Sequence, residues 1–243
     1  MISVGFKTDR GISRTDNEDS VFVLPDRQIY MVADGVGGHN SGELASRMTV
    51  GYMAQFVALH PLESIKEEIG LKEYFLNMFG GANDLVFKKS ISERDNLGMA
   101  TTVVLCYLRD SKAYVVNVGD SRAYLVRDGV LRQITSDHTL VQEMIDSGQI
   151  TEAEAEERPD KNMITRAIGG EPTVVPDFFS FDTYPGDTIV LCTDGLYGEL
   201  DPESFARLAG SAKTMHKLSI DLVDTANRNG GHDNISVVCI RIQ

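Results

Sequence analysis

A chain of 243 residues lies near the upper length that one hydrophobic core supports, so we expect one large domain over residues 1–243. Its 36 acidic and 23 basic residues give a formal net charge of −13, which disfavours nucleic acid or an anionic membrane as a partner. No apolar run approaches the roughly 18 residues that span a bilayer, and no export signal is recognised, so the expected location is the cytoplasm.

Apolar periodicity predicts strands and then two helices in the first part of the chain. Ser41 is a suitable N-cap for the first helix, and Ser64–Glu67 forms a capping box before the second. Gly80 and Gly81 are expected to break or kink that second helix. The expected strands are residues 2–6, 20–24 and 29–33, and the expected helices are 41–59 and a longer one that ends near residue 90.

Short connections join the strands that follow. Asp128–Gly129 suits a two-residue hairpin turn with positive φ angles. Because short hairpins join antiparallel neighbours, this region argues against a doubly wound parallel sheet. The expected strands are residues 101–108, 113–119, 123–127 and 130–135.

Residues 138–170 interrupt this series of strands with two short predicted helices, 139–148 and 151–158. Their place between strands predicts a flap over a site. Strands this apolar need both faces covered, so we expect an α/β sandwich of two packed antiparallel β-sheets flanked by helices, with the small helical flap. The remaining expected elements are strands at 178–181, 187–193 and 235–242, a helix that starts at Asp201–Pro202, and a helix over 213–227.

The three cysteines lie inside apolar runs and lack C-x-x-C spacing. Their odd number argues against a disulfide framework, and we expect buried, reduced thiols. They are Cys106, Cys192 and Cys239.

Four aspartates stand beside apolar runs: Asp34, Asp120 and Asp194 follow such runs, and Asp233 precedes one. Any one of them alone would more often be a turn residue, but four at strand ends indicate a metal site. Oxygen ligands favour Mg²⁺ or Mn²⁺ over zinc, and no histidines form the H-E-x-x-H pair of a zinc hydrolase. Two such cations about 3.5–4 Å apart hold and ionise a bridging water, which indicates attack on phosphorus esters.

These aspartates belong to short segments that resemble the motifs of one enzyme family. The match spans almost the whole chain, and the segments are specific as a set although each is weak alone. In order, they resemble the motifs of the metal-dependent protein serine/threonine phosphatases of type 2C, the PPM family, and most of all its compact bacterial members. The segments are Arg14–Asp19, Asp34–His39, Met99–Thr102, Val118–Arg122, Cys192–Leu196 and Gly231–Asn234.

The resemblance implies a β-sandwich that holds two Mn²⁺ or Mg²⁺ ions at one edge. Asp34 would bridge both ions, and a hydroxide between them would attack phosphorus in line without a phosphoenzyme. Arg14 would bind the substrate phosphate. The other implied metal residues are Asp194 and Asp233 on the first ion, the carbonyl of Gly35 on the second, Glu18 and Asp19 through water molecules, and Asp120 with Asp194 on a third, looser ion of bacterial members.

One position departs from many eukaryotic relatives, which have histidine directly after Asp-Gly. Here Val36 occupies that position, and His39 comes three residues later. His39 is therefore a candidate general acid or phosphate-side residue, with a local hydrogen-bonding role as the alternative. Ala100 stands where glycine is frequent, which is a mild change. The flap, residues 138–170, corresponds to the family's variable segment, where we expect substrate choice to be set.

The leading hypothesis is therefore a phosphoserine and phosphothreonine protein phosphatase. The expected partners are phosphorylated proteins, including a cognate serine/threonine kinase and its substrates, and a monomer is the default oligomeric state. A catalytically silent phosphoprotein-binding module of the same fold is the main alternative. A two-metal phosphodiesterase or nuclease is a further one, although the acidic balance and the lack of a basic stripe count against it.

Overall fold

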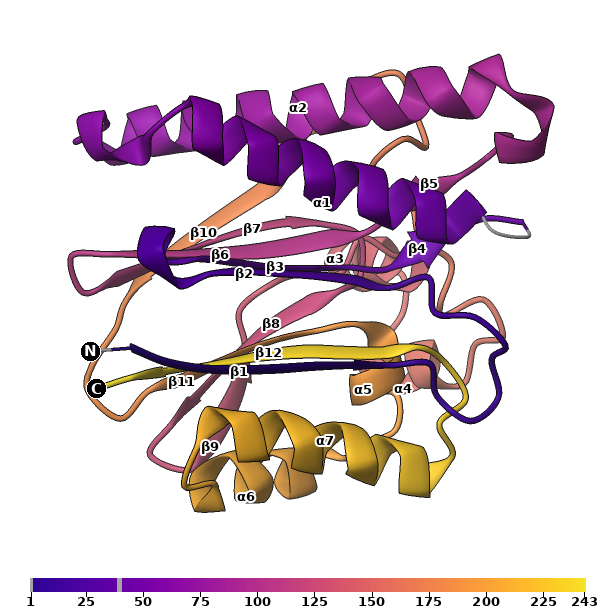
Figure 1. Ribbon diagram of the computed structural model, residues 1–243. Coiled ribbons are helices and arrows are strands. Elements are labelled where there is room, and N and C mark those ends of the chain that lie inside the picture. Colours follow the sequence, from indigo (N-terminus) through magenta and orange to yellow (C-terminus); the bar gives the residue numbers. More distant parts are fainter. Residues whose placement is uncertain (1, 39–40) are drawn as a thin grey trace.

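A computed structural model describes residues 2–38 and 41–243, and these residues form four layers (Figure 1). Two five-stranded antiparallel sheets lie face to face at the centre. Helices cover the outer face of each sheet, so the order through the molecule is helices, sheet, sheet, helices. The predicted sandwich of two antiparallel sheets flanked by helices is confirmed.

The first sheet lies under the longer helix pair, α1 (Ser41–Leu59) and α2 (Glu68–Ser92). A two-stranded ladder of β4 (Gly35–Val36) with β5 (Ala100–Thr101) extends beside it. The strands of the first sheet are, in spatial order, β10 (Asp177–Asp182), β7 (Lys112–Val118), β6 (Val103–Arg109), β3 (Ile29–Ala33) and β2 (Ser20–Leu24).

The second sheet joins the two ends of the chain, because β1 and β12 pair along their full lengths. Its outer face is covered by α6 (Pro202–Ser211) and α7 (Met215–Asn229). A single helical turn, α5 (Asp194–Tyr197), follows β11 and was not predicted. The strands are, in spatial order, β1 (Ile2–Asp9), β12 (Ile235–Ile242), β11 (Thr188–Cys192), β8 (Arg122–Arg127) and β9 (Val130–Gln133).

Strand β3 shows why the central strands have continuous apolar sequences. All five of its residues are buried, and they alternate between two hydrophobic clusters. Ile29 and Met31 pack toward the α1–α2 pair, whereas Tyr30 and Val32 pack between the two sheets. An antiparallel strand that is covered on both faces needs no polar alternation. The three cysteines are buried and unpaired, as predicted: Cys106 lies in the cluster between the sheets, and Cys192 and Cys239 lie in the cluster under α6 and α7.

Two local predictions are wrong. The strand expected at 101–108 is divided at Thr102, whose backbone and side chain bond Asp34 instead of continuing one ladder. The capping box at Ser64–Glu67 does not form. Ser64 ends a 3-10 turn, Leu62–Ser64, and the next residue, Ile65, is extended and packs against the core.

Helix α2 continues through Gly80 and Gly81 rather than ending there. A Cβ atom on Gly81 would lie 1.9 Å from the hydroxyl of Tyr52 on α1, so the glycine allows the two helices to approach closely. Despite the 25-residue length of α2, no helix in the described ranges is long and apolar enough to cross a membrane.

The segment expected to form a flap holds two short helices, α3 (Leu140–Asp146) and α4 (Glu152–Glu156), between β9 and β10. The second helix begins with a capping box, in which Thr151 and Glu154 are bonded in both directions. The two sides of the segment are bonded to each other, and its start is bonded to the body of the protein. Thr165 N–H donates to the carbonyl of His138 at 2.8 Å, and His138 N–H donates to the carbonyl of Gly119 at 3.1 Å.

Candidate active site

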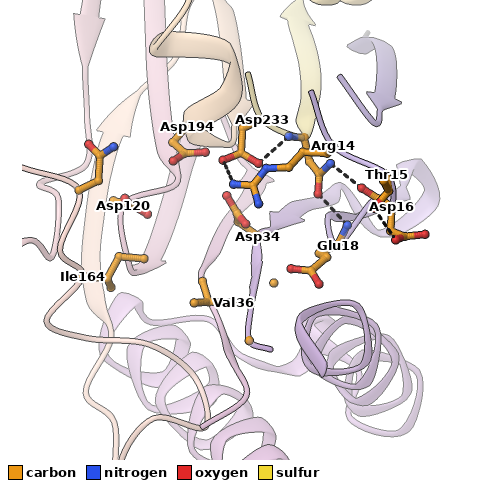
Figure 2. A pocket seen from close by; sticks show the side chains of 14 residues that line it. Arg14, Thr15, Asp16, Glu18, Asp34, Val36, Asp120, Ile164, Asp194 and Asp233 are labelled. Carbon is orange, nitrogen blue, oxygen red and sulfur yellow. Dashed lines mark hydrogen bonds and ion pairs between the residues drawn. The ribbon is translucent and has the colours of Figure 1, made fainter. Parts of the chain in front are cut away.

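The ends of strands from both sheets form the wall of one pocket of about 460 Å³ (Figure 2). Strands β3 and β7 run in the same direction and end at this edge, which places Asp34 and Asp120 there. In the second sheet, β11 ends where the antiparallel β12 begins, which adds Asp194 and Asp233. The structure therefore brings together the four aspartates that the sequence placed at strand ends.

Asp34 is held through its backbone by two neighbouring threonines. Its N–H donates to Thr102 Oγ1 at 3.0 Å, and its carbonyl accepts from the Thr102 N–H at 2.8 Å and from Thr101 Oγ1 at 2.7 Å. The next residue, Gly35, lies against the start of α1, where a Cβ atom would approach the carbonyl oxygen of Gly42 to 2.1 Å. The Met99–Thr102 motif thus fixes the position of the central carboxylate.

Burial and mutual repulsion govern the protonation of these carboxylates. Burial, followed by the charges of the neighbouring carboxylates, raises the pKa of Asp34 well above its ordinary value. The same causes raise the pKa of Asp120 to about 7, and they also raise the pKa of Asp194. The ionised carboxylates repel one another, and a bound cation would neutralise their negative charge.

Two carboxylate oxygens at the site are buried without a hydrogen-bond partner, Asp19 Oδ1 and Asp194 Oδ1. Asp19 lies behind the pocket wall, where its Oδ2 accepts from Thr193 Oγ1 at 3.0 Å, and burial raises its pKa to about 7. A buried acceptor without a donor is costly unless a cation or water satisfies it. The oxygen-only donor set and these unpartnered atoms fit a hard divalent cation.

As the side chains stand, no group of three or more histidine, cysteine, aspartate or glutamate residues within 2–38 and 41–243 is arranged to hold a metal ion. Asp233 is instead paired with a cationic side chain. Its Oδ2 accepts from Arg14 Nη2 at 2.7 Å, so a guanidinium supplies the positive charge at that carboxylate (Figure 2). The hydrogen bond with Asp233 raises the pKa of Arg14.

Asn234 organises the loop that carries Arg14 and Glu18. Its Oδ1 accepts from the Glu18 N–H at 2.8 Å, and its Nδ2 donates to the carbonyls of Arg10 and Asp16 at 2.9 and 2.8 Å. The sequence reading noted Asn234 only as part of a motif and missed this function. A sign of this role in the sequence is that Asn234 directly follows Asp233, a candidate metal ligand. Burial raises the pKa of Glu18, whose side chain lines the pocket.

Most of the predicted site residues line this one pocket. Asp19 lies just behind the wall, and His39 is outside the described residues, so its assignment stays a prediction. Sequence reasoning missed the pocket contacts of Asn162 and Ile164, which come from the end of the predicted flap. The individual catalytic and metal-binding roles also stay predictions. The predicted residues in the pocket are Arg14, Glu18, Asp34, Gly35, Asp120, Asp194 and Asp233.

Comparisons with known proteins agree with this geometry. Residues 8–227 match the sequence profile of the family described as Protein phosphatase 2C. The chain is 37% identical over 238 residues to the serine/threonine phosphatase stp of Listeria monocytogenes, covering 97% of this chain and 94% of that protein. It is 33% identical to the serine/threonine protein phosphatase PstP of Mycobacterium tuberculosis, covering 96% of this chain and 43% of that longer protein.

Solved structures show the same likeness across the whole fold. The S. agalactiae serine/threonine phosphatase superposes with a TM-score of 0.92 at 31% identity, covering 100% of both chains. The catalytic domain of PstP, solved in complex with two manganese ions, gives a TM-score of 0.84 at 31% identity, covering 99% of both chains. The chain therefore belongs to the protein phosphatase 2C family, and its prediction as a protein serine/threonine phosphatase is confirmed.

Proposed function

We propose that this chain removes phosphate from phosphoserine and phosphothreonine in proteins and uses two divalent cations, Mn²⁺ or Mg²⁺, in the aspartate pocket. The observation that carries the proposal is the convergence of four strand-end carboxylates on one pocket, where burial and neighbouring charge raise the pKa of Asp34, Asp120 and Asp194. The two manganese ions of the PstP catalytic domain support the number and kind of ion. We keep residues 1–243 as one catalytic domain with 138–170 as its flap.

The residues divide into those that would hold cations and those that would orient water. Asp34 would contact both ions because its backbone is held at the centre of the pocket by Thr101 and Thr102. Bound cations of this kind neutralise phosphate charge and lower the pKa of a water molecule, so that water serves as the nucleophile at neutral pH. The other proposed ligands are Asp194, Asp233 and the Gly35 carbonyl, with Glu18 and Asp19 orienting water molecules and Asp120 with Asp194 at a third cation.

Arg14 would bind the phosphoryl oxygens of the substrate. Its guanidinium lies in the pocket, is half-exposed, and uses Nη2 for Asp233. A guanidinium has five N–H donors in a fork that matches phosphate oxygens, so one side chain can contact both a carboxylate and a phosphate. The charge that develops on the equatorial oxygens during phosphoryl transfer would be stabilised there.

The substrates would be proteins phosphorylated by a serine/threonine kinase of the same cell, with the chain acting as a monomer. The names of the relatives, which are serine/threonine phosphatases, support this substrate class. A silent phosphoprotein-binding module of the same fold would bind such proteins without releasing phosphate. The uninterrupted set of four aspartates favours the enzyme.

Phosphate release from a phosphothreonine peptide tests the proposal. The purified chain is assayed with Mn²⁺, with Mg²⁺ and with a chelator, alongside Asp233→Asn and the control Asp182→Asn, whose side chain is exposed on β10. Release that needs a cation, is lost in Asp233→Asn and persists in Asp182→Asn is expected. A folded chain that releases no phosphate with any cation would instead support the silent binding module.

A further inference from the structure

A second cavity, of about 530 Å³, adjoins the aspartate pocket. We call it the side groove, and it lies between β4–β5 and residues 164–175. Val36 and Ile164 line both cavities, so the two are adjacent and meet at these side chains. Figure 2 shows these two side chains on the side of the pocket opposite Thr15 and Asp16. A peptide with its phosphate in the pocket therefore has a path into the side groove.

The lining of the side groove is mainly apolar. Val36 is 43% exposed and Val175 is 67% exposed, which leaves aliphatic surface uncovered next to the pocket. The cation in the lining, Arg166, is already paired, since its Nη1 donates to Asp177 Oδ1 at 2.9 Å and to the carbonyl of Val175 at 3.1 Å. The lining also includes the exposed Glu171, so it is the aliphatic part of the groove, around Val36 and Val175, that suits an apolar side chain.

The wall of the side groove is fixed to the body of the protein. Ile168 and Thr101 exchange two backbone hydrogen bonds, of 2.8 and 3.0 Å. The buried side chain of Asn83 on α2 accepts from the Gly169 N–H at 2.8 Å and donates to the carbonyl of Glu171 at 3.0 Å. A wall held in place before binding costs little ordering entropy when a ligand enters.

We propose that the side groove binds an apolar side chain of the substrate protein, a few residues along the chain from the phosphorylated serine or threonine. The inference rests on the proposed function, because it needs a phosphoprotein in the pocket. The shared lining limits the separation: an extended peptide advances about 3.3 Å per residue, so the apolar side chain belongs within about three residues of the phosphoresidue. The proposed occupant is thus defined by its apolar chemistry and by its spacing from the phosphoresidue.

The size of the preference follows from the area that such a side chain removes from water. Burial of about 40 Å² of apolar surface at about 25 cal/mol per Å² corresponds to a factor of about five in kcat/KM. A leucine in the groove should therefore improve a phosphothreonine peptide about fivefold over serine at the same position. An aspartate there should be worse than serine, because burial of an unpaired carboxylate is unfavourable.

The test measures kcat/KM with Mn²⁺ for phosphothreonine peptides in which leucine or serine is placed at each of the three positions on either side. One or two positions should prefer leucine about fivefold. Val175→Ser should bring that ratio close to one, whereas Val130→Ser should keep it. Val130 is the matched control, because it is 65% exposed on β9, in the other sheet.

Two results would overturn the inference. The first is an equal rate for leucine and serine peptides at every position, and the second is a leucine preference that survives Val175→Ser. Turnover of the small substrate p-nitrophenyl phosphate separates this failure from failure of the proposed function. If that substrate and all peptides are hydrolysed without preference, the phosphatase proposal stands and the side groove proposal falls. If none is hydrolysed, both fall.

Discussion

Strand β11 has an aspartate close to each end, and the two have opposite environments. Before the strand, Asp187 is 2% exposed and accepts from Arg127 Nε and Nη2 at 2.8 and 2.7 Å and from the Tyr184 N–H at 2.8 Å. Burial acts to raise the pKa of Asp187, but these hydrogen bonds outweigh it, and the pKa lies below its ordinary value.

Beyond the other end of β11, Asp194 has a raised pKa and a buried oxygen without a partner. The two sites differ in what surrounds the carboxylate: a paired guanidinium at Asp187, other carboxylates at Asp194. A buried aspartate with satisfied hydrogen bonds stabilises the fold, whereas a cluster that lacks its counter-charge marks a functional site. Substitutions at the two ends should therefore affect different properties.

The largest expected effect is on turnover. Asp194→Asn or Asp34→Asn should lower kcat about a thousandfold or more, because each removes a charge that the cations need. Unfolding by urea in the presence of chelator should show a metal-free protein at least as stable as the parent, since one source of repulsion is gone. A variant that keeps parental turnover would contradict the role of its aspartate.

At the other end of β11, Asp187→Asn should leave turnover close to that of the parent but destabilise the fold. The loss should be about 2–3 kcal/mol in the free energy of unfolding, at the low end for a broken buried pair, because Arg127 is partly exposed. Urea denaturation measures it. Asp182→Asn is the control, since its exposed carboxylate should change stability by less than about 0.5 kcal/mol.

A smaller effect is expected where Thr102 holds Asp34. Thr102→Val removes the acceptor for the Asp34 N–H and the bond to Ser121 Oγ, so it should cost about 1–3 kcal/mol of stability and lower turnover. Thr49→Val is a matched control: Thr49 is equally buried, but its hydroxyl has no partner. Its replacement should be neutral or stabilising. Equal losses in the two variants would contradict the role of Thr102.

The last expected effect is a pH dependence of stability in the presence of chelator. Asp19 and Asp120 have pKa values raised from 3.8 to about 7, so the folded chain binds more protons than the unfolded chain between these values. The stability that proton binding to these two carboxyl groups contributes is complete below about pH 4 and is lost as the pH rises through 7. Urea midpoints in chelator should be lower at pH 8 than at pH 5, and Mn²⁺ should reduce the difference. A higher midpoint at pH 8 would contradict the raised pKa values.

The positions of the four aspartates were predictable because each follows or precedes an apolar run that is buried on both faces. Strands β3 and β12 match the expected ranges for the same reason. The pairing of Gly35–Val36 with Ala100–Thr101 was not predictable, because it joins residues far apart in sequence and interrupts a continuous apolar run at Thr102. Local propensity does not contain such long-range pairing.

The part of the pocket wall that the flap forms could not be predicted from the sequence either. Residues 138–170 indicated a cover over a site, but nothing in their periodicity placed Ile164 beside Val36. The segment that carries Ile164 is held there by the backbone bonds between Ile168 and Thr101 and by the Asn83 side chain, which come from distant elements. Polar residues such as Asn83 and Asn234, which hold loops rather than bind ligands, have no periodic signal.

The most direct test of the account is the number of Mn²⁺ ions that the chain binds. Isothermal titration of Mn²⁺ into chelator-treated and dialysed protein compares the parent with Asp34→Asn and with Asp182→Asn. We expect at least two ions to bind to the parent and to Asp182→Asn, and we expect the tight binding to be lost in Asp34→Asn. Parental binding in a folded Asp34→Asn protein would contradict the claim that the strand-end aspartates form the metal centre.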